Sequence, residues 1–159
     1  MVSELITEFK VLGIGSPFGD DQLGWKAVDL LQKQKDLQPF LLNRISFDCC
    51  DRPGPALLDY MTGSRTVFLI DAVKSNSKLG TIHRFTENEI ETNCQTFSSH
   101  GFGLAEAIQL GRVLNALPQH LIFYGIEVGD LTSDDLTNTI EHALTQLVDK
   151  MTHELLTLL

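Results

Sequence analysis

The stretch that most constrains the fold runs from 9 to 24 and reads FKVLGIGSPFGDDQLG. A short apolar run with two glycines comes first, at 11–15. Proline and glycine then break regular structure, and a helical pattern begins after the acidic pair Asp20 and Asp21. This order predicts a buried strand, a tight turn and a helix, the opening of an α/β domain. Because such sheets bind ligands beyond the carboxyl ends of their strands, we expect the acidic pair at the ligand-binding edge.

The two glycines of the turn do not complete a dinucleotide-binding motif. The third glycine of G-x-G-x-x-G would fall at Phe18, and the acidic pair occupies the place where a pyrophosphate would need the helix N-terminus. No P-loop lysine follows the turn either. Asp20 and Asp21 could simply cap the helix, since Asp is favourable at an N-cap and in the first turn. These residues alone leave capping and a functional site both open.

Charge and composition exclude several classes of function. The 159 residues include 12 basic and 21 acidic side chains, a net charge of −9, which opposes binding to nucleic acid or anionic membranes. The acidic N-terminal segment lacks the apolar core of a signal peptide, and no apolar run approaches the length of a membrane span. Three cysteines without C-x-x-C spacing are typical of a reduced protein. We therefore expect a cytoplasmic protein with a single domain over 1–159.

The rest of the chain alternates between strand and helix patterns, which indicates a three-layer α/β sandwich. The apolar run at 66–70 is typical of a central strand, and 81–85 of an edge strand. Residues 86–95 are polar and are assigned no element. The other predicted strands are 11–14, 41–47 and 121–125, and the predicted helices are 20–35, 56–61, a segment after His100 that includes 104–113, and a last helix from 133 or 134 to 158.

Three polar residues lie at the ends of predicted elements that converge on one edge of the sheet. Asp21 lies at the start of the first helix, Asp71 ends the third strand, and His100 precedes a later helix. Two carboxylates and an imidazole form an O,O,N ligand set suited to a borderline divalent metal. A helix N-terminus disfavours protonated histidine, and the neutral imidazole is the form that binds metal. Asp71 could also cap the following turn, and His100 could be an ordinary helix-start residue.

The motif GIGSPFGDDQLG resembles the opening of the hydrogenase maturation endopeptidases, in which a G-x-G-N loop leads to an acidic pair and a glycine. In that family the metal-binding residues are the second acid of the pair, an Asp ending the third strand and a His opening a later helix. They match Asp21 in GDDQLG, Asp71 in FLIDAV and His100 in SSHGFGLAE. The resemblance implies a mixed, mostly parallel five-stranded sheet between helical layers, of the phosphorylase/hydrolase-like kind.

The resemblance also implies an activity. The protein would remove a short C-terminal extension from the precursor of a nickel–iron hydrogenase large subunit, after nickel insertion. The nickel would be supplied by the precursor, and Asp21, Asp71 and His100 would engage it and place the scissile bond beside it. The metal could then polarise the peptide carbonyl or activate water. Two alternatives remain: a hydrolase that keeps its own metal at these residues, and a nickel- or precursor-binding chaperone that does not cleave.

Two segments depart from the family pattern. Ser16 stands where Asn is usual, and the loop after the second predicted strand reads DCCDRPG where D-G-G-T is common. This loop is thought to govern substrate choice in the family, and the Arg-Pro-Gly variant resembles that of proteases serving NAD-linked bidirectional hydrogenases. We assign Asp51 and Arg52 to substrate recognition, with Arg52 able to pair with a carboxylate or C-terminus of the precursor.

Nucleophile-based schemes have less support in the sequence. No serine lies in a G-x-S-x-G motif, and the D-T-G or D-S-G of aspartic proteases is missing. Cys49 or Cys50 could pair with a histidine as a thiol nucleophile. Small cysteines at the end of a strand are more often packing residues, which is the interpretation we favour.

Overall fold

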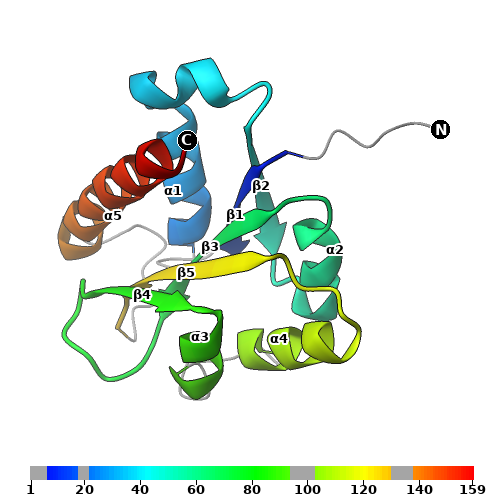
Figure 1. Cartoon of the computed structure of the whole chain (residues 1–159). Coiled ribbons are helices and arrows are strands. Elements are labelled where there is room, and N and C mark those ends of the chain that lie inside the picture. The colour runs from blue at the N-terminus through cyan, green and yellow to red at the C-terminus, as the bar shows by residue number, and fades with distance from the viewer. Residues whose placement is uncertain (1–6, 18–21, 94–102, 130–137) are drawn as a thin grey trace.

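The computed structural model describes residues 7–17, 22–93, 103–129 and 138–159 (Figure 1). Strands and helices alternate through most of these segments, as the sequence predicts. In chain order the elements are β1 (Phe9–Gly15), α1 (Leu23–Gln32), the 3₁₀ helix η2 (Lys35–Phe40), β2 (Ile45–Asp51), the 3₁₀ helix η3 (Gly54–Ala56), α2 (Leu57–Met61), β3 (Thr66–Val73), β4 (Ile82–Thr86), α3 (Glu87–Asn93), α4 (Leu104–Val113), β5 (His120–Glu127) and α5 (Asn138–Leu158).

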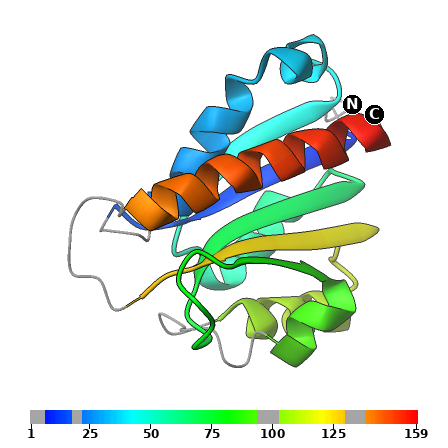
Figure 2. The same ribbon diagram turned by 90° about the vertical axis from the view of Figure 1, so that its left-hand side faces the viewer.

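The described strands form one five-stranded sheet in the order β2-β1-β3-β5-β4. Neighbouring strands are parallel except for β4, which pairs antiparallel with β5 at one edge. Helices α1 and α5 cover one face of the sheet, while α2, α3 and α4 cover the other (Figures 1 and 2). A separate apolar core fills each interface, as expected for a sheet buried on both faces. This arrangement confirms the predicted α/β fold, with its mixed and mostly parallel sheet.

Helix α1 is held against the sheet by two glycines. A Cβ atom added at Gly13 would lie 2.3 Å from the carbonyl oxygen of Gly24, and one added at Gly24 would lie 2.3 Å from that of Ile14. The helix backbone therefore contacts the strand backbone directly, which only glycine permits. The indole Nε1 of Trp25 also donates a hydrogen bond to the carbonyl oxygen of Cys50 at 3.0 Å. Together these contacts fix the first turn of α1 beside the ends of β1 and β2.

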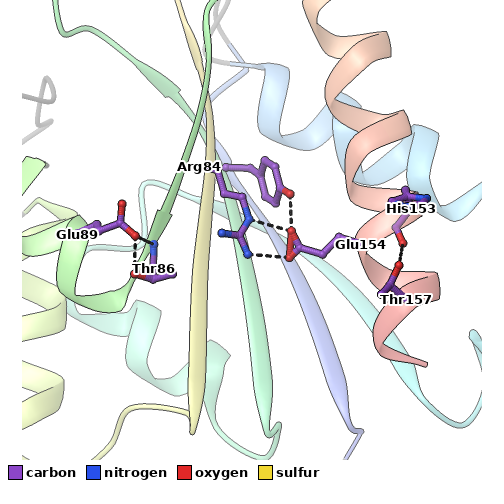
Figure 3. Close-up of polar contacts among 7 residues, drawn as sticks. Arg84, Thr86, Glu89, His153, Glu154 and Thr157 are labelled. Atoms are coloured by element: carbon purple, nitrogen blue, oxygen red, sulfur yellow. Dashed lines mark hydrogen bonds and ion pairs between the residues drawn. The ribbon is translucent and has the colours of Figure 1, made fainter.

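Helix α5 is tied to the sheet by a polar contact within its largely apolar interface (Figure 3). Arg84 on β4 forms a two-pronged ion pair with Glu154 on α5, at 2.8 and 3.1 Å. The hydroxyl of Tyr124 on β5 donates to the same carboxylate at 2.5 Å. Burial raises the pKa of Tyr124. Burial also opposes the charge on Glu154, but hydrogen bonds from Arg84 and Tyr124 outweigh it, so the pKa of Glu154 is lowered.

The second strand lies later in the chain than predicted. It runs over Ile45–Asp51 instead of 41–47, so the segment predicted as the start of a loop is part of the sheet. The apolar residues that suggested an earlier strand lie in a turn, where Leu42 is 92% exposed. Among the described strands β2 lies at the edge of the sheet, beside β1, and its side chains are partly exposed, so it does not need an apolar run.

Other element boundaries also differ from prediction. Helix α1 ends at Gln32, because Gln34 takes an extended backbone before η2 begins. Strand β3 continues two residues beyond Asp71, to Val73. The predicted start of the first helix, at Asp20, and that of the last, at 133 or 134, lie outside the described residues.

The segment 86–95, to which no element was assigned, contains α3 over Glu87–Asn93. At its start the Glu89 carboxylate accepts the Thr86 amide at 3.4 Å, which is one half of a capping box, and the Thr86 hydroxyl donates to the same oxygen at 2.7 Å. The sequence does contain a sign of a helix start here, a Thr and a Glu three residues apart. The segment is so polar, however, that no apolar periodicity indicates a helix after it.

Candidate functional site

The strand register brings several acidic residues to one edge of the sheet. Asp51 at the end of β2 lies level with Gly15 at the end of β1. On the other side of β1, Asp71 on β3 lies level with Gly125 on β5, and two residues further along these strands Val73 lies level with Glu127. All four strands run parallel, so these positions share the carboxyl edge of the sheet. This is the edge at which α/β proteins bind their ligands.

Asp71 lies in the central strand β3 and is partly buried. Its carboxylate Oδ1 accepts a hydrogen bond from the amide of Ala72 at 2.7 Å, which fixes the orientation of one oxygen. The backbone oxygen of the preceding residue, Ile70, faces Gly24 on α1. The first turn of α1 therefore contacts the backbone of β3 at the residue before Asp71.

The other two predicted metal ligands, Asp21 and His100, lie outside the described residues, so the structure does not bring either together with Asp71. Asp21 precedes Gly24 by three residues, and His100 precedes Gly103, the N-cap of α4, by three residues. Among the residues that the structure describes, no group of three or more His, Cys, Asp or Glu side chains is arranged to hold a metal ion. The three-ligand set thus stays a prediction.

Asp51 and Arg52 form the second part of the edge, on the far side of β1 from Asp71. The Arg52 backbone has a φ of 43°, a left-handed conformation that is uncommon for a residue other than glycine. Its amide donates to the Gly15 oxygen at 3.1 Å, and its Nε donates to the Asp51 carboxylate at 2.8 Å. The side chain of Arg52 is 51% exposed and that of Asp51 is 49% exposed, so the guanidinium faces solvent at the carboxyl edge. Unusual backbone conformations of this kind concentrate at functional sites.

The two cysteines near the end of β2, Cys49 and Cys50, are poor nucleophiles. Cys50 is buried in the core beneath the edge, and burial together with Asp48 raises its pKa to about 12. Cys49 is exposed, but partial burial of its thiol and the nearby carboxylates of Asp48 and Asp29 raise its pKa as well. The thiolate is the reactive form of cysteine, and both groups are thiols at neutral pH. This supports the packing interpretation for Cys50.

Glu127 lies just past the strand predicted over 121–125 and was given no role, but in the structure it ends β5 and forms a buried polar cluster at this edge. Its side chain is 2% exposed. The Ser75 amide donates to its Oε2 at 2.8 Å, and Oε1 contacts both the Ser75 hydroxyl and, at 3.2 Å, Nε2 of His83. Burial opposes ionisation, but the hydrogen bonds from Ser75 and His83 outweigh it, so the pKa of Glu127 is lowered. A buried carboxylate is therefore ionised close to the position of Asp71.

A further structural property concerns membranes. Within the described part of the chain, none of the helices combines the length and the hydropathy that crossing a bilayer requires.

An α/β sandwich with acidic residues at the carboxyl ends of its parallel strands defines a class of proteins that act on ligands at this edge. A profile of the family described as hydrogenase maturation protease matches residues 53–154, which include the positions of Asp71 and His100. The chain belongs to this family. It is accordingly a hydrolase, an endopeptidase in the processing of hydrogenase large subunits. A search among curated proteins finds no match.

Solved structures show the same fold. A hydrogenase maturating endopeptidase from E. coli, HybD, is 22% identical, with a TM-score of 0.78, over 91% of this chain and 90% of that one. The nickel–iron hydrogenase maturation protease HybD from Thermococcus kodakarensis is 19% identical, with a TM-score of 0.68, over 94% and 99% of the two chains. The protease HycI from the same organism is 16% identical, with a TM-score of 0.66, over 92% and 91%.

Proposed function

We propose that this protein removes the C-terminal extension of a nickel-loaded precursor of a nickel–iron hydrogenase large subunit. Family membership supports the reaction class, and the names of two similar structures, from Thermococcus kodakarensis, include nickel–iron hydrogenase. The structural observation that carries the proposal is the place of Asp71. Its carboxylate is partly buried near the carboxyl end of the central strand, and the backbone oxygen of the preceding residue, Ile70, lies against Gly24 in the first turn of α1.

In this proposal Asp21, Asp71 and His100 engage the nickel that the precursor supplies. Carboxylate and imidazole ligands suit a borderline divalent metal, and precursor cysteines complete the coordination shell. The metal then lies beside the scissile bond, where it polarises the carbonyl or activates water. Because the enzyme contributes only three ligands and no thiolate, it holds the metal weakly in its resting state.

Asp51 and Arg52 serve recognition of the precursor in the same proposal. The exposed guanidinium of Arg52 is held at the carboxyl edge by its backbone contact with Gly15 and its bond to Asp51. Arginine pairs with carboxylates in a two-pronged geometry, so a carboxylate or the C-terminus of the precursor can compete with Asp51 for it. Arg52→Ala should raise the KM for the precursor while the unfolding midpoint stays within the small range of surface substitutions. An unchanged KM would remove Arg52 from recognition.

Mass analysis of a candidate precursor tests the function. The large-subunit precursors of the source organism are incubated with the protein, each with and without bound nickel. We expect one precursor to lose the mass of its extension, and only in its nickel-loaded form. Cleavage without nickel, together with a stoichiometric metal on the purified protein, would indicate a hydrolase with its own metal. Stable binding of the precursor without any loss of mass would indicate a maturation chaperone.

A further inference from the structure

The Glu127 carboxylate is a buried anion, and among the residues that the structure describes no lysine or arginine bonds it. Its bonds come instead from the Ser75 amide, the Ser75 hydroxyl and His83. Removing a carboxylate from water is costly, and such a group persists where its oxygens accept several well-placed hydrogen bonds. Ser75 follows β3 and His83 lies near the start of β4. The carboxylate therefore joins both ends of the segment that connects these strands.

The same segment is closed by backbone hydrogen bonds. The Glu127 amide donates to the backbone oxygen of Thr81 at 2.8 Å, and the Gly80 amide donates to the backbone oxygen of Glu127 at 2.9 Å. The Val128 amide donates to the Val73 oxygen, also at 2.8 Å. The bond from Val128 holds Val73, the last residue of β3, to the chain just after β5. The side chain of Glu127 in turn holds Ser75, which follows β3. The carboxyl end of β3 is thereby fixed from two directions.

This end of β3 carries Asp71. Val73 and Glu127 lie opposite each other, and Asp71 precedes Val73 by two residues. Because side chains alternate along a strand, Asp71, Val73 and Glu127 point to the same face of the sheet, the face covered by α3 and α4. Fraying at the end of β3 would therefore reach Asp71 within two residues, and ends of strands are the first parts of a sheet to open.

We propose that Glu127 is a positioning residue, which keeps the Asp71 carboxylate in its reactive orientation by bonding Ser75 and His83 to the end of β3. This inference rests on the proposed function, because Asp71 has a reactive orientation only if it engages the metal of the precursor. Glu127 touches neither metal nor substrate in this account. Its contribution is the fixed geometry of the strand end rather than its negative charge.

Two substitutions separate geometry from charge. In Glu127→Gln, the amide oxygen can accept from the Ser75 amide, and the amide NH₂ can donate to the Ser75 hydroxyl oxygen and to His83 in its other tautomer. The cluster therefore survives without its charge. In Glu127→Ala all three contacts are lost. Glu154→Ala is a matched control, since it also removes a carboxylate that accepts three hydrogen bonds, on the opposite face of the sheet.

The first readout is cleavage of the nickel-loaded precursor. We expect kcat to fall at least about tenfold in Glu127→Ala with KM nearly unchanged, because the defect is in orientation and not in binding. Glu127→Gln should restore most of the lost kcat. Glu154→Ala should lower the unfolding temperature but leave kcat intact. A wild-type kcat in Glu127→Ala would overturn the proposal, and so would a Glu127→Gln variant as slow as Glu127→Ala.

The second readout needs no substrate. Amide hydrogen exchange at Ala72, Val73 and Val128, followed by NMR, should be about tenfold faster in Glu127→Ala, and unchanged in Glu154→Ala. If Glu127→Ala does not fold, Ser75→Ala, which removes one hydroxyl contact, should show a smaller change at the same amides. Unchanged exchange in the folded variant refutes the positioning role. A wild-type protein that cleaves no precursor refutes the proposed function instead, whatever the exchange rates show.

Discussion

Gly24→Ala tests whether the direct contact between α1 and the sheet supports the site. The new Cβ would lie 2.3 Å from the carbonyl oxygen of Ile14 and 2.7 Å from that of Ile70, and neither backbone atom can rotate away. Ordinary contacts are about 3.5 Å, so α1 has to retreat by about 1 Å. Overpacking costs about 1–3 kcal/mol, with the upper end expected against backbone. The better helix propensity of alanine offsets about 1 kcal/mol, which leaves a net loss of about 2 kcal/mol in the free energy of unfolding.

Urea unfolding measures this loss, and Gly111→Ala is the control. Gly111 is also a buried helical glycine, but its new Cβ would meet Leu117 Cδ2 at 2.5 Å and Leu58 Cδ2 at 2.9 Å, which are ends of flexible side chains. We expect Gly111→Ala to cost less than about 1 kcal/mol, because these side chains can rotate and the same gain in helix propensity applies. Equal stability of the two variants would refute the backbone-contact argument.

The same variant has a functional consequence. A helix displaced by about 1 Å moves the segment that precedes it, which includes Asp21, and misplacement on this scale can cost about a hundredfold in rate. Precursor cleavage by Gly24→Ala should therefore fall far more than cleavage by Gly111→Ala, at a temperature where both remain folded. Equal cleavage by the two folded variants would show that the α1 contact has no part in the reaction.

Three further predictions concern the described residues. Folding lowers the pKa of Glu154, so the stabilisation from its carboxylate is present above about pH 4.5 and is lost as the pH falls through the folded-state pKa. The difference in urea midpoint between the wild type and Glu154→Gln should therefore shrink from pH 7 to about pH 3. A difference that stays constant would contradict this. In a Cys94→Ser background, a thiol reagent should label the exposed Cys49 slowly in the native protein and Cys50 only on unfolding; rapid native labelling of Cys50 would disprove its burial. Thr86→Ala should lower the helix content of α3 slightly, since it removes the hydroxyl contact that orients the Glu89 carboxylate toward the Thr86 amide. Circular dichroism identical to the wild type would show that this contact contributes nothing.

The parts of the fold that were predictable are those in which local sequence and burial agree. The runs at 11–15 and 66–70 are apolar because their strands lie inside the sheet with neighbours on both sides. Strand β2 was misplaced because an edge strand carries polar residues, while the apolar Leu42 lies in an exposed turn. Helix α3 was missed because the Thr86 and Glu89 pair at its start lies in a segment without strong apolar periodicity.

The candidate site was predictable where a residue follows an apolar strand, as Asp71 does. The cluster around Glu127 was not, because Ser75 and His83 are 52 and 44 residues away in the chain and only the pairing of β3, β4 and β5 brings them together. The left-handed backbone of Arg52 was equally hidden, since arginine gives no local signal for it. Asp21 and His100 rest on motif and resemblance, and stay predictions.

Comparing Asp21→Asn with Asp20→Asn in precursor cleavage tests the central claim most directly. Asn is as good an N-cap as Asp, so two residues that only cap α1 would tolerate the change equally. A ligand at Asp21 instead loses the anionic oxygen that binds a divalent metal. We predict that Asp21→Asn folds but does not cleave the nickel-loaded precursor, while Asp20→Asn retains most activity. Equal activity in the two variants would contradict the assignment of Asp21, and an inactive Asp20→Asn beside an active Asp21→Asn would transfer the role to Asp20.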